Sequence, residues 1–490
     1  MFLNKLDKEQ KLFYLFLIIH FLVWSMIGLI RVVLPTDSLE GIWWGSFLNA
    51  GNPKHPPLAG WITYLTYTVF KSNVSIYVLS QTFILGGFIY VYKLAKNFLT
   101  KNQAMLSVVL LEGCWIYCYV TGYYGFNPDV VLLFTLPAIT YYFYQCMFSN
   151  KFSNWLMLGI LTGISFLDKF QSGLLIVAMA VWALLFRRKT FKNKYFYMAV
   201  IIAFILFSPH LFWLIKHDFM PFLYLETKLE TLSFIRHLTE PFMFLFMQIV
   251  QILTPVCMYL LFKKVSKSPF KLNKNIDEKG WFLIILTMVP LIIHLLIALQ
   301  SGSNVRPQWG YVFWYMTGII LLYFIPSEIN ESGFKRILKY SYTVMFIIFL
   351  SFGTMLTVEK NYRSRYPVAK VFGDFKQIWN NKYNTPLKYI GGFSEWTFPI
   401  TIYGDTHPIN IMDTYGYKNL WLDEEDLKKS GAFIVGRSSD FVVASTKSSC
   451  PYLSDEIEIV PVEYKFTLTN ALNQSREYTI YYYIVPPQNI

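Results

Sequence analysis

Long apolar runs separated by short polar connections fill the first 357 residues of the chain. A helix needs about 18 or more mostly apolar residues to cross the hydrocarbon of a bilayer. Eleven runs approach or exceed this length, at about 12–34, 74–95, 103–122, 129–148, 153–168, 171–186, 195–215, 240–262, 280–300, 309–325 and 337–357. The short fifth and sixth runs also fit one buried hairpin. Together the runs predict a polytopic α-helical membrane protein.

The pattern changes at a charged linker that begins at Val358. Short apolar segments at 387–390, 409–412 and 433–435 then alternate with polar helical ones such as 423–429, and 457–460, 464–468 and 478–485 indicate antiparallel strands. We therefore predict two domains: a transmembrane domain over 1–357, with an external loop at 35–73, and a soluble external α/β domain over 358–490.

Composition supports a bilayer environment. Hydrophobic residues make up 54% of the chain and charged residues only 15%, against roughly 25% charged residues in a typical soluble domain. A soluble fold could not bury this much apolar surface.

The distribution of Lys and Arg predicts the orientation, because short cytoplasmic loops are enriched in these residues. The N-terminus and alternate connections carry 21 of them, and the opposite side before residue 358 carries 8. The N-terminus is therefore expected in the cytoplasm and the C-terminal domain outside. From residue 358 onward there are 14 basic and 15 acidic residues, so the membrane part carries +14 and the C-terminal part −1 of the total charge of +13. It indicates contact with membrane lipids and no nucleic-acid partner.

The first external loop has unusual polar content. Asp37 and Glu40 would lie near the start of a helix over about 38–49, where carboxylates are favoured and can also serve simply as caps. Trp43 and Trp44 suit a helix lying at the membrane interface, although either ring could instead contact sugar. Lys54 and His55 follow, so an acid and a cation are held at the membrane surface.

The order of motifs resembles the membrane glycosyltransferases related to dolichyl-phosphate-mannose protein mannosyltransferases and to the lipid A aminoarabinose transferase, which have the GT-C fold. The first external loop, with Asp37-Ser-Leu-Glu40 and Lys54-His55-Pro-Pro, looks like that of the family. Later landmarks follow in the same order: Gly125-Phe-Asn127-Pro-Asp129, Phe166-Leu-Asp168-Lys169-Phe, Ser208-Pro-His210 and the external segment 386–436.

This resemblance implies an enzyme of the bacterial inner membrane that takes a monosaccharide from a polyprenyl-phosphate donor. The acceptor would be lipid A, another surface glycolipid or a protein at the outer, periplasmic face. The donor phosphate requires cations at headgroup depth. The candidates are Lys54, His55, Lys169 and Arg306. Lys169 could otherwise extend to the interface, and Arg306 could anchor a headgroup.

The chemistry requires a base for the attacking hydroxyl or amine, and Asp37 is our candidate. Cations that neutralise the departing phosphate make a protonating acid unnecessary, which suits inversion in a single displacement. Glu40, Asp129 and Asp168 leave open a covalent intermediate with retention. By resemblance the family inverts, and we expect no cofactor and no divalent metal.

Several polar residues form a secondary candidate site for sugar or acceptor. Asn127 and Asp129 could instead cap a helix, and the aromatic ones could belong to an interfacial belt. This secondary set comprises Asn127, Asp129, Tyr123, Tyr124, Trp43, Trp44, Asp168 and His210. Glu112 falls within an apolar run, so it should face a cavity or a partner.

Two other functions remain as alternatives. A transporter or flippase of lipid-linked sugars would also need many spans and buried charges, but internal repeats are not evident. A scaffold without catalytic activity would tolerate charge-neutral substitutions over 37–55.

Overall fold

The computed structural model describes residues 6–228, 233–302, 305–359, 362–411, 420–453 and 457–488. It divides into two compact units. The first contains Met1–Ile27, Ala50–Ala59 and Tyr77–Phe352, and the second contains Gly28–Asn49, Gly60–Ile76 and Gly353–Ile490. Parts of the first external loop thus belong to the same unit as the C-terminal segment. The predicted division at residue 357 into membrane and external parts stays a prediction.

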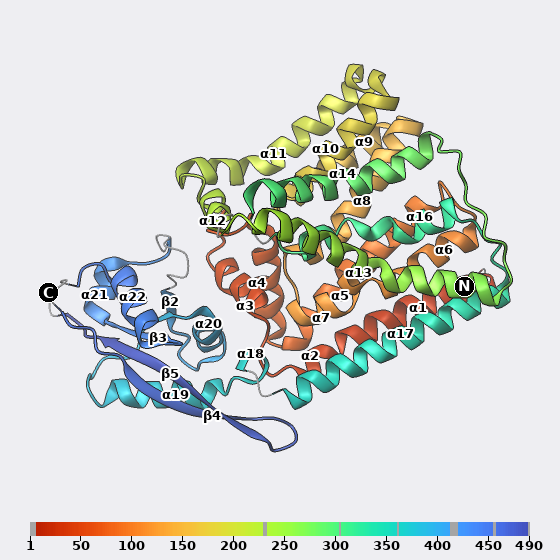
Figure 1. Ribbon diagram of the computed structural model, residues 1–490. Coiled ribbons are helices and arrows are strands. Elements are labelled where there is room, and N and C mark those ends of the chain that lie inside the picture. Colours follow the sequence, from red (N-terminus) through yellow and green to blue (C-terminus); the bar gives the residue numbers. More distant parts are fainter. Residues whose placement is uncertain are drawn as a thin grey trace. The chain divides into compact units, whose positions relative to one another are not determined.

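The first unit is almost entirely helical (Figure 1). Its main helices are α1 (Lys8–Ser25), α5 (Asn73–Ala95), α6 (Lys101–Val109), α7 (Tyr119–Tyr124), α8 (Pro128–Ser149), α9 (Phe152–Phe166), α10 (Ser172–Phe186), α11 (Lys194–Lys216), α12 (Met220–Lys228), α13 (Arg236–Val265), α14 (Glu278–Ser301), α16 (Thr317–Phe324) and α17 (Glu331–Val358). Shorter helical turns are η2 (Leu110–Gly113), η3 (Trp115–Tyr117), η4 (Arg188–Lys192), α15 (Gln308–Tyr311) and η5 (Trp314–Met316). Two packed sets are prominent: α8, α9 and α11 in one, and α10, α13 and α14 in the other.

Seven helices in the described ranges are long and apolar enough to cross a membrane, and an eighth joins them if a bent pair counts as one span. The first of the seven combines α1 with α2 (Ile27–Ile30), and the others are α5, α8, α11, α13, α14 and α17. Every predicted run coincides with helix, but α9, α10 and the segment Trp314–Phe324 are short. A helix of 15 residues such as α9 extends only about 22 Å, less than the roughly 30 Å of hydrocarbon.

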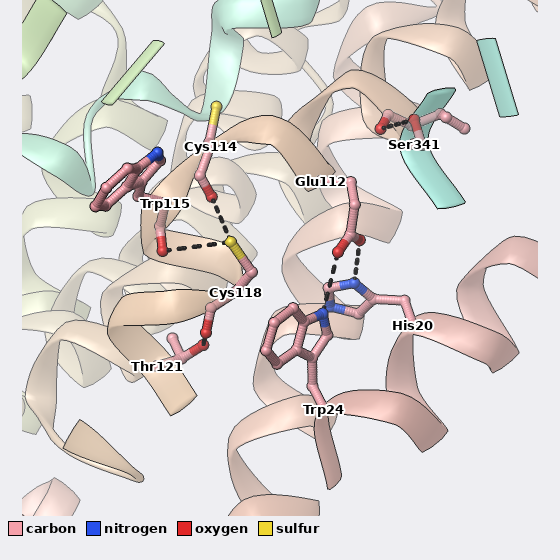
Figure 2. A network of polar contacts seen from close by, with 9 residues as sticks. His20, Trp24, Glu112, Cys114, Trp115, Cys118, Thr121 and Ser341 are labelled. Atoms are coloured by element: carbon pink, nitrogen blue, oxygen red, sulfur yellow. Dashed lines mark hydrogen bonds and ion pairs between the residues drawn. The ribbon is translucent and has the colours of Figure 1, made fainter. Parts of the chain in front are cut away.

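The bent pair is the third predicted run, in which Lys101–Gly113 and Trp115–Tyr124 meet at 77°. Cys114 between them has an extended backbone, which ends one helical segment before the next begins. Figure 2 shows that Glu112 at this bend points to side chains of α1. His20 Nδ1 lies 2.5 Å from Glu112 Oε2, and Trp24 Nε1–H donates to Glu112 Oε1 at 3.1 Å. The expectation that Glu112 faces a partner is confirmed, and the network ties α1 to the bend.

The second unit contains a five-stranded sheet in the order β2-β1-β3-β5-β4. Its strands are β1 (Tyr389–Gly392), β2 (Ile409–Ile411), β3 (Ala432–Gly436), β4 (Val462–Thr469) and β5 (Ser475–Val485). The first three are parallel to one another, and β5 is antiparallel to both β3 and β4. All five residues of central β3 are buried. Near the end of edge strand β4, buried and exposed side chains alternate, and Phe466 and Leu468 are the buried ones. This alternation is expected of a strand with one covered face.

Helices complete the second unit: α3 (Thr36–Gly45), α4 (Leu58–Phe70), α18 (Tyr362–Arg365), α19 (Val368–Asn380), α20 (Ser394–Tyr403), α21 (Glu424–Ser430) and α22 (Ser439–Ser449). The α/β pattern expected from the sequence is present. One predicted strand is wrong: 457–460 is not a strand, and Ile457 and Val460 are 41% and 59% exposed. These side chains find no buried face to pack against. Residue 412, the end of another predicted strand, lies outside the described residues.

Candidate functional site

The loop that carries Lys54 and His55 has a fixed local structure. Asn52 is buried, and its Oδ1 accepts the backbone N–H groups of Lys54 at 3.0 Å and His55 at 2.8 Å. The N–H of Asn52 donates to the carbonyl of His55 at 3.3 Å. Asn is suited to this role because its short side chain can bond the backbone two or three residues ahead. The loop therefore holds the two candidate side chains in a defined turn.

Three further contacts anchor this loop to the helices of the first unit. The N–H of Leu58 donates to the carbonyl of Leu167 at 3.0 Å. His210 Nδ1–H donates to the carbonyl of Ala50 at 2.7 Å. A Cβ on Gly51 would lie only 2.3 Å from the Trp213 ring, so a larger residue there would displace the ring or the loop. His210, a predicted secondary site residue, thus contributes its Nδ1 to the anchoring of the loop.

The turn between α9 and α10 supplies the central cation. Lys169 Nζ lies 2.5 Å from Asp129 Oδ1, and each side chain is 13% exposed. Asp129 is placed by the start of α8, where Asn127 is the N-cap and accepts the N–H of Val130 at 3.3 Å. The cap interpretation of Asn127 is therefore confirmed, whereas Asp129 forms an ion pair. An ion pair this poorly exposed needs both partners, because either charge alone would be costly to bury.

Arg306 is exposed, and its loop is tied to α13 and to the turn between α9 and α10. Gln248 of α13 donates from Nε2 to the carbonyl of Pro307 at 3.0 Å. Gln171, at the end of the Lys169 turn, donates from Nε2 to the carbonyl of Trp309. These contacts join the Arg306 loop to the turn that carries Lys169.

Charges from three separate segments act on His55. Burial lowers the pKa of His55 well below its usual range, and the positive charges of Lys54, Lys169 and Arg306 lower it further. The imidazole is therefore neutral at neutral pH. Three cations, Lys54, Lys169 and Arg306, lie within electrostatic range of His55. We call these three residues the cation cluster. An excess of positive charge around a partly buried group is suited to binding an anion.

Asp168 has a different environment from Asp129. It is fully buried, and neither carboxyl oxygen has a hydrogen-bond partner in the described part of the chain. Burial without compensating hydrogen bonds favours the neutral carboxylic acid. In this state Asp168 is poorly suited to act as a nucleophile, and a catalytic role for it stays a prediction.

An apolar cavity of about 470 Å³ adjoins the turn of Lys169. Side chains from α9, α10, α11 and α12 line it, including Phe166, Phe207 and Phe222. Phe170, the residue after Lys169, is also part of the wall and stacks on Phe222 with ring centroids 5.0 Å apart. The sequence alone did not reveal this cavity, because its apolar residues are indistinguishable from others in the same helices.

The acidic candidates of the external loop lie in the second unit. Helix α3 begins at Thr36, two residues earlier than predicted, and ends at Gly45 instead of near 49. Its N-cap is Pro35, so neither Asp37 nor Glu40 is the cap residue. Asp37 is half-buried in the first turn, and Glu40 is buried. Their catalytic roles stay predictions.

Helix α3 packs on α20, beside the sheet of the second unit. Trp43 and Phe47 contact Trp421, with Phe47 stacked at 5.1 Å between ring centroids. Trp44 is almost fully buried. These packing contacts were missed from the sequence, which indicated an interfacial helix.

Tyr123 and Tyr124 form the end of α7 in the first unit and are half-buried. Their rings contact each other edge to face at 5.0 Å. A sugar-binding role for them stays a prediction. Within the described ranges, no three His, Cys, Asp or Glu side chains are grouped closely enough to hold a metal ion.

Comparison with known proteins places these residues in context. Residues 54–213 match the family model described as dolichyl-phosphate-mannose-protein mannosyltransferase. This range includes Lys54, His55, Asp129, Asp168 and Lys169. It lacks the α3 helix with Asp37 and Glu40, and it ends before Arg306.

One curated relative and one solved structure extend the comparison. The chain is 25% identical over 194 residues to the lipopolysaccharide core galacturonosyltransferase RgtA of Rhizobium johnstonii, and the match spans 38% of each protein. The apo crystal structure of ArnT from Cupriavidus metallidurans aligns with a TM-score of 0.62 at 12% identity, covering 97% of this chain and 99% of that one. The second likeness concerns the fold alone. Residues 54–213 therefore resemble the dolichyl-phosphate-mannose-protein mannosyltransferases, and the chain as a whole has a fold similar to that of ArnT.

Proposed function

We propose that this protein transfers a monosaccharide from a polyprenyl-phosphate donor to a lipid or protein acceptor at the outer face of the membrane. The observation that carries the proposal is the cation cluster around His55, which adjoins an apolar cavity through Phe170. A donor of this class has one charged phosphate between a sugar and a long apolar tail. It therefore needs an anion site next to an apolar channel.

The phosphate is expected to bind Lys54, Lys169 and Arg306, with His55 as a neutral hydrogen-bonding group. Lys169 already has an anionic partner in Asp129 at 2.5 Å. The donor phosphate would share Lys169 with Asp129 or replace it. In either case the cations neutralise charge that grows on the phosphate as the glycosidic bond breaks.

The tail of the donor is expected to occupy the apolar cavity next to Phe170. The cavity of about 470 Å³ would hold the part of the chain nearest the phosphate. The rest of a polyprenyl chain would extend into lipid, where apolar burial is equally favourable.

The proposed reaction is a single displacement with inversion. An acceptor hydroxyl or amine forms a bond to the anomeric carbon as the bond from that carbon to the phosphate oxygen breaks. Asp37 takes the proton from the acceptor, and polyprenyl phosphate leaves. Glu40 is the other carboxylate of α3 and is placed second because it is buried. The scheme requires no metal ion and no cofactor.

The proposed topology has eleven membrane crossings, with the short helices α9, α10 and Trp314–Phe324 counted among them. The N-terminus is cytoplasmic and the sheet of the second unit is periplasmic. Support comes from the asymmetry of Lys and Arg among the loops. For the acceptor, the RgtA match favours a lipopolysaccharide-type glycolipid over protein.

The test is a transfer assay with purified full-length protein and a polyprenyl-phosphate sugar that is radiolabelled in the sugar. We compare Asp37→Asn and Lys169→Ala with Lys216→Ala, a control that removes an exposed cation from the end of α11. We expect each site variant to lose at least a hundredfold in rate and the control to stay within twofold. Normal transfer by both site variants would disprove the assignment of the site. Movement of intact donor across a vesicle membrane without sugar release would favour the transporter alternative.

A further inference from the structure

A second cavity, of about 760 Å³, lies at the other end of the first unit from the candidate site. Its walls come from the end of α13, the segment 266–271, the segment 326–330 and the first turns of α17. Helix α13 passes both sites. Its Gln248 contacts the Arg306 loop, and its Val265, 17 positions later, lines this cavity. That separation corresponds to roughly 26 Å along the helix. The two sites are therefore distinct.

The charged side chains that line the cavity are mostly basic. Lys267, Lys271 and Arg336 contribute positive charge, and Glu328 contributes the one negative charge among the lining residues described. Arg336 Nη1 donates to Ser266 Oγ at 3.1 Å, which orients the guanidinium along the wall. Guanidinium and ammonium groups at one concave surface are suited to binding a phosphate group.

A buried network supports the polar wall. Lys263 is only 3% exposed, and its Nζ donates to the carbonyl of Pro326 at 2.9 Å and to Ser327 Oγ at 2.8 Å. Gln103 Nε2 donates to the carbonyl of Ser327 at 2.9 Å, and Ser268 Oγ lies 3.3 Å from Ser327 Oγ. A fixed cation behind the wall adds positive potential that solvent screens weakly.

Part of the remaining wall is apolar, with Phe262, Val265, Pro269 and Pro326, and the rest has uncharged polar side chains such as Asn330 and Ser332. A cavity with basic, polar and apolar wall residues fits a phosphate ester whose neighbouring atoms are apolar. At the end of a candidate span, this is the chemistry of an anionic phospholipid headgroup. We propose that this cavity is a binding site for a phosphate group, with an anionic lipid headgroup or free phosphate as its source.

The site is separate from the proposed donor site, and it does not depend on the sugar chemistry. By the distribution of Lys and Arg it lies on the cytoplasmic side of the proposed topology. A bound lipid would contact both α13 and α17, two of the candidate spans.

The experiment measures binding to the purified full-length protein in a neutral detergent. The probes are fluorescent dioleoyl phosphatidylglycerol, the same label on phosphatidylcholine, and inorganic phosphate as competitor. The pocket variant is Lys267→Gln/Lys271→Gln/Arg336→Gln. The matched control is Arg188→Gln/Lys189→Gln/Lys192→Gln, which removes three exposed cations from η4, on the same predicted side and outside the cavity. Lys271→Glu is a second, single variant at an exposed position.

We expect phosphatidylglycerol to bind at least tenfold more tightly than phosphatidylcholine. The pocket variant should lose at least tenfold in affinity, Lys271→Glu at least threefold, and the control less than twofold. Persistence of binding in 10 mM inorganic phosphate identifies the lipid headgroup as the ligand, and displacement identifies free phosphate. An equal loss in the control, or no preference for the anionic lipid together with no phosphate binding, would overturn the proposal.

Discussion

The network at the bend, formed by Glu112, His20 and Trp24, permits a quantitative prediction. The side chains of His20 and Glu112 are fully buried, with 2.5 Å between Nδ1 and Oε2. Glu112→Leu removes the acceptor of both His20 and Trp24. Removal of one member of a buried pair typically costs about 3–5 kcal/mol, because the partner stays buried without compensation. We expect a loss of this size in the free energy of unfolding.

The double variant His20→Leu/Glu112→Leu should recover part of this loss. Replacement of both members of a buried pair by apolar residues of similar volume is often neutral or stabilising. Only the Trp24 Nε1–H then lacks its acceptor, which costs about 1–3 kcal/mol. The double variant should therefore be more stable than Glu112→Leu by about 1–3 kcal/mol.

The assay is denaturant-induced unfolding of the purified protein in detergent, followed by circular dichroism. Glu331→Gln is the comparison, since Glu331 pairs with Lys8 and Lys335 at 2.6 Å but is 42% exposed. Its loss should be much smaller, because water screens exposed pairs. The reasoning would be refuted if Glu112→Leu were no worse than Glu331→Gln, or if the double variant were less stable than Glu112→Leu.

Three further predictions concern the loop, the cation cluster and helix packing. Gly51→Ala should raise the KM for the sugar donor at least fivefold in the transfer assay, since its Cβ would overlap the Trp213 ring and displace the loop; an unchanged KM would contradict this. The imidazole of His55 should titrate well below pH 6.5 in histidine-modification rates, and Lys54→Met should raise its pKa by removing one of the charges that lower it. Gly318→Ala should destabilise the protein by about 1–3 kcal/mol in the unfolding assay, because its Cβ would lie 2.0 Å from a backbone carbonyl oxygen of α6.

The sequence predicted the helices well, because an apolar run long enough to span a bilayer has few other stable conformations in lipid. The bend at Cys114 was not predicted. The partners of Glu112 lie 92 and 88 residues away in α1, and only tertiary packing brings them together. The strand predicted at 457–460 failed for a related reason, since local β propensity does not ensure a neighbouring strand.

The sequence motifs identified candidate site residues, but only the structure shows which of them contact one another. Lys169 was singled out as a cation between two short apolar runs, but its pair with Asp129, 40 residues away, was not foreseen. His210 was grouped with possible sugar ligands, which stays a prediction, and the anchoring of the loop through its Nδ1 and the Ala50 carbonyl was not foreseen. Neither outcome follows from sequence spacing, because both depend on how α8, α9 and α11 pack.

The central claim is tested most directly by the fate of a polyprenyl-phosphate sugar incubated with the purified protein and a lipopolysaccharide-type acceptor. Mass spectrometry follows the lipid carrier and the acceptor in the same sample. The account predicts the appearance of free polyprenyl phosphate with an equal amount of acceptor heavier by one sugar, and the loss of both products in Lys169→Ala but not in Lys216→Ala. Donor that stays intact in the presence of well-folded protein, with every acceptor offered, would contradict it.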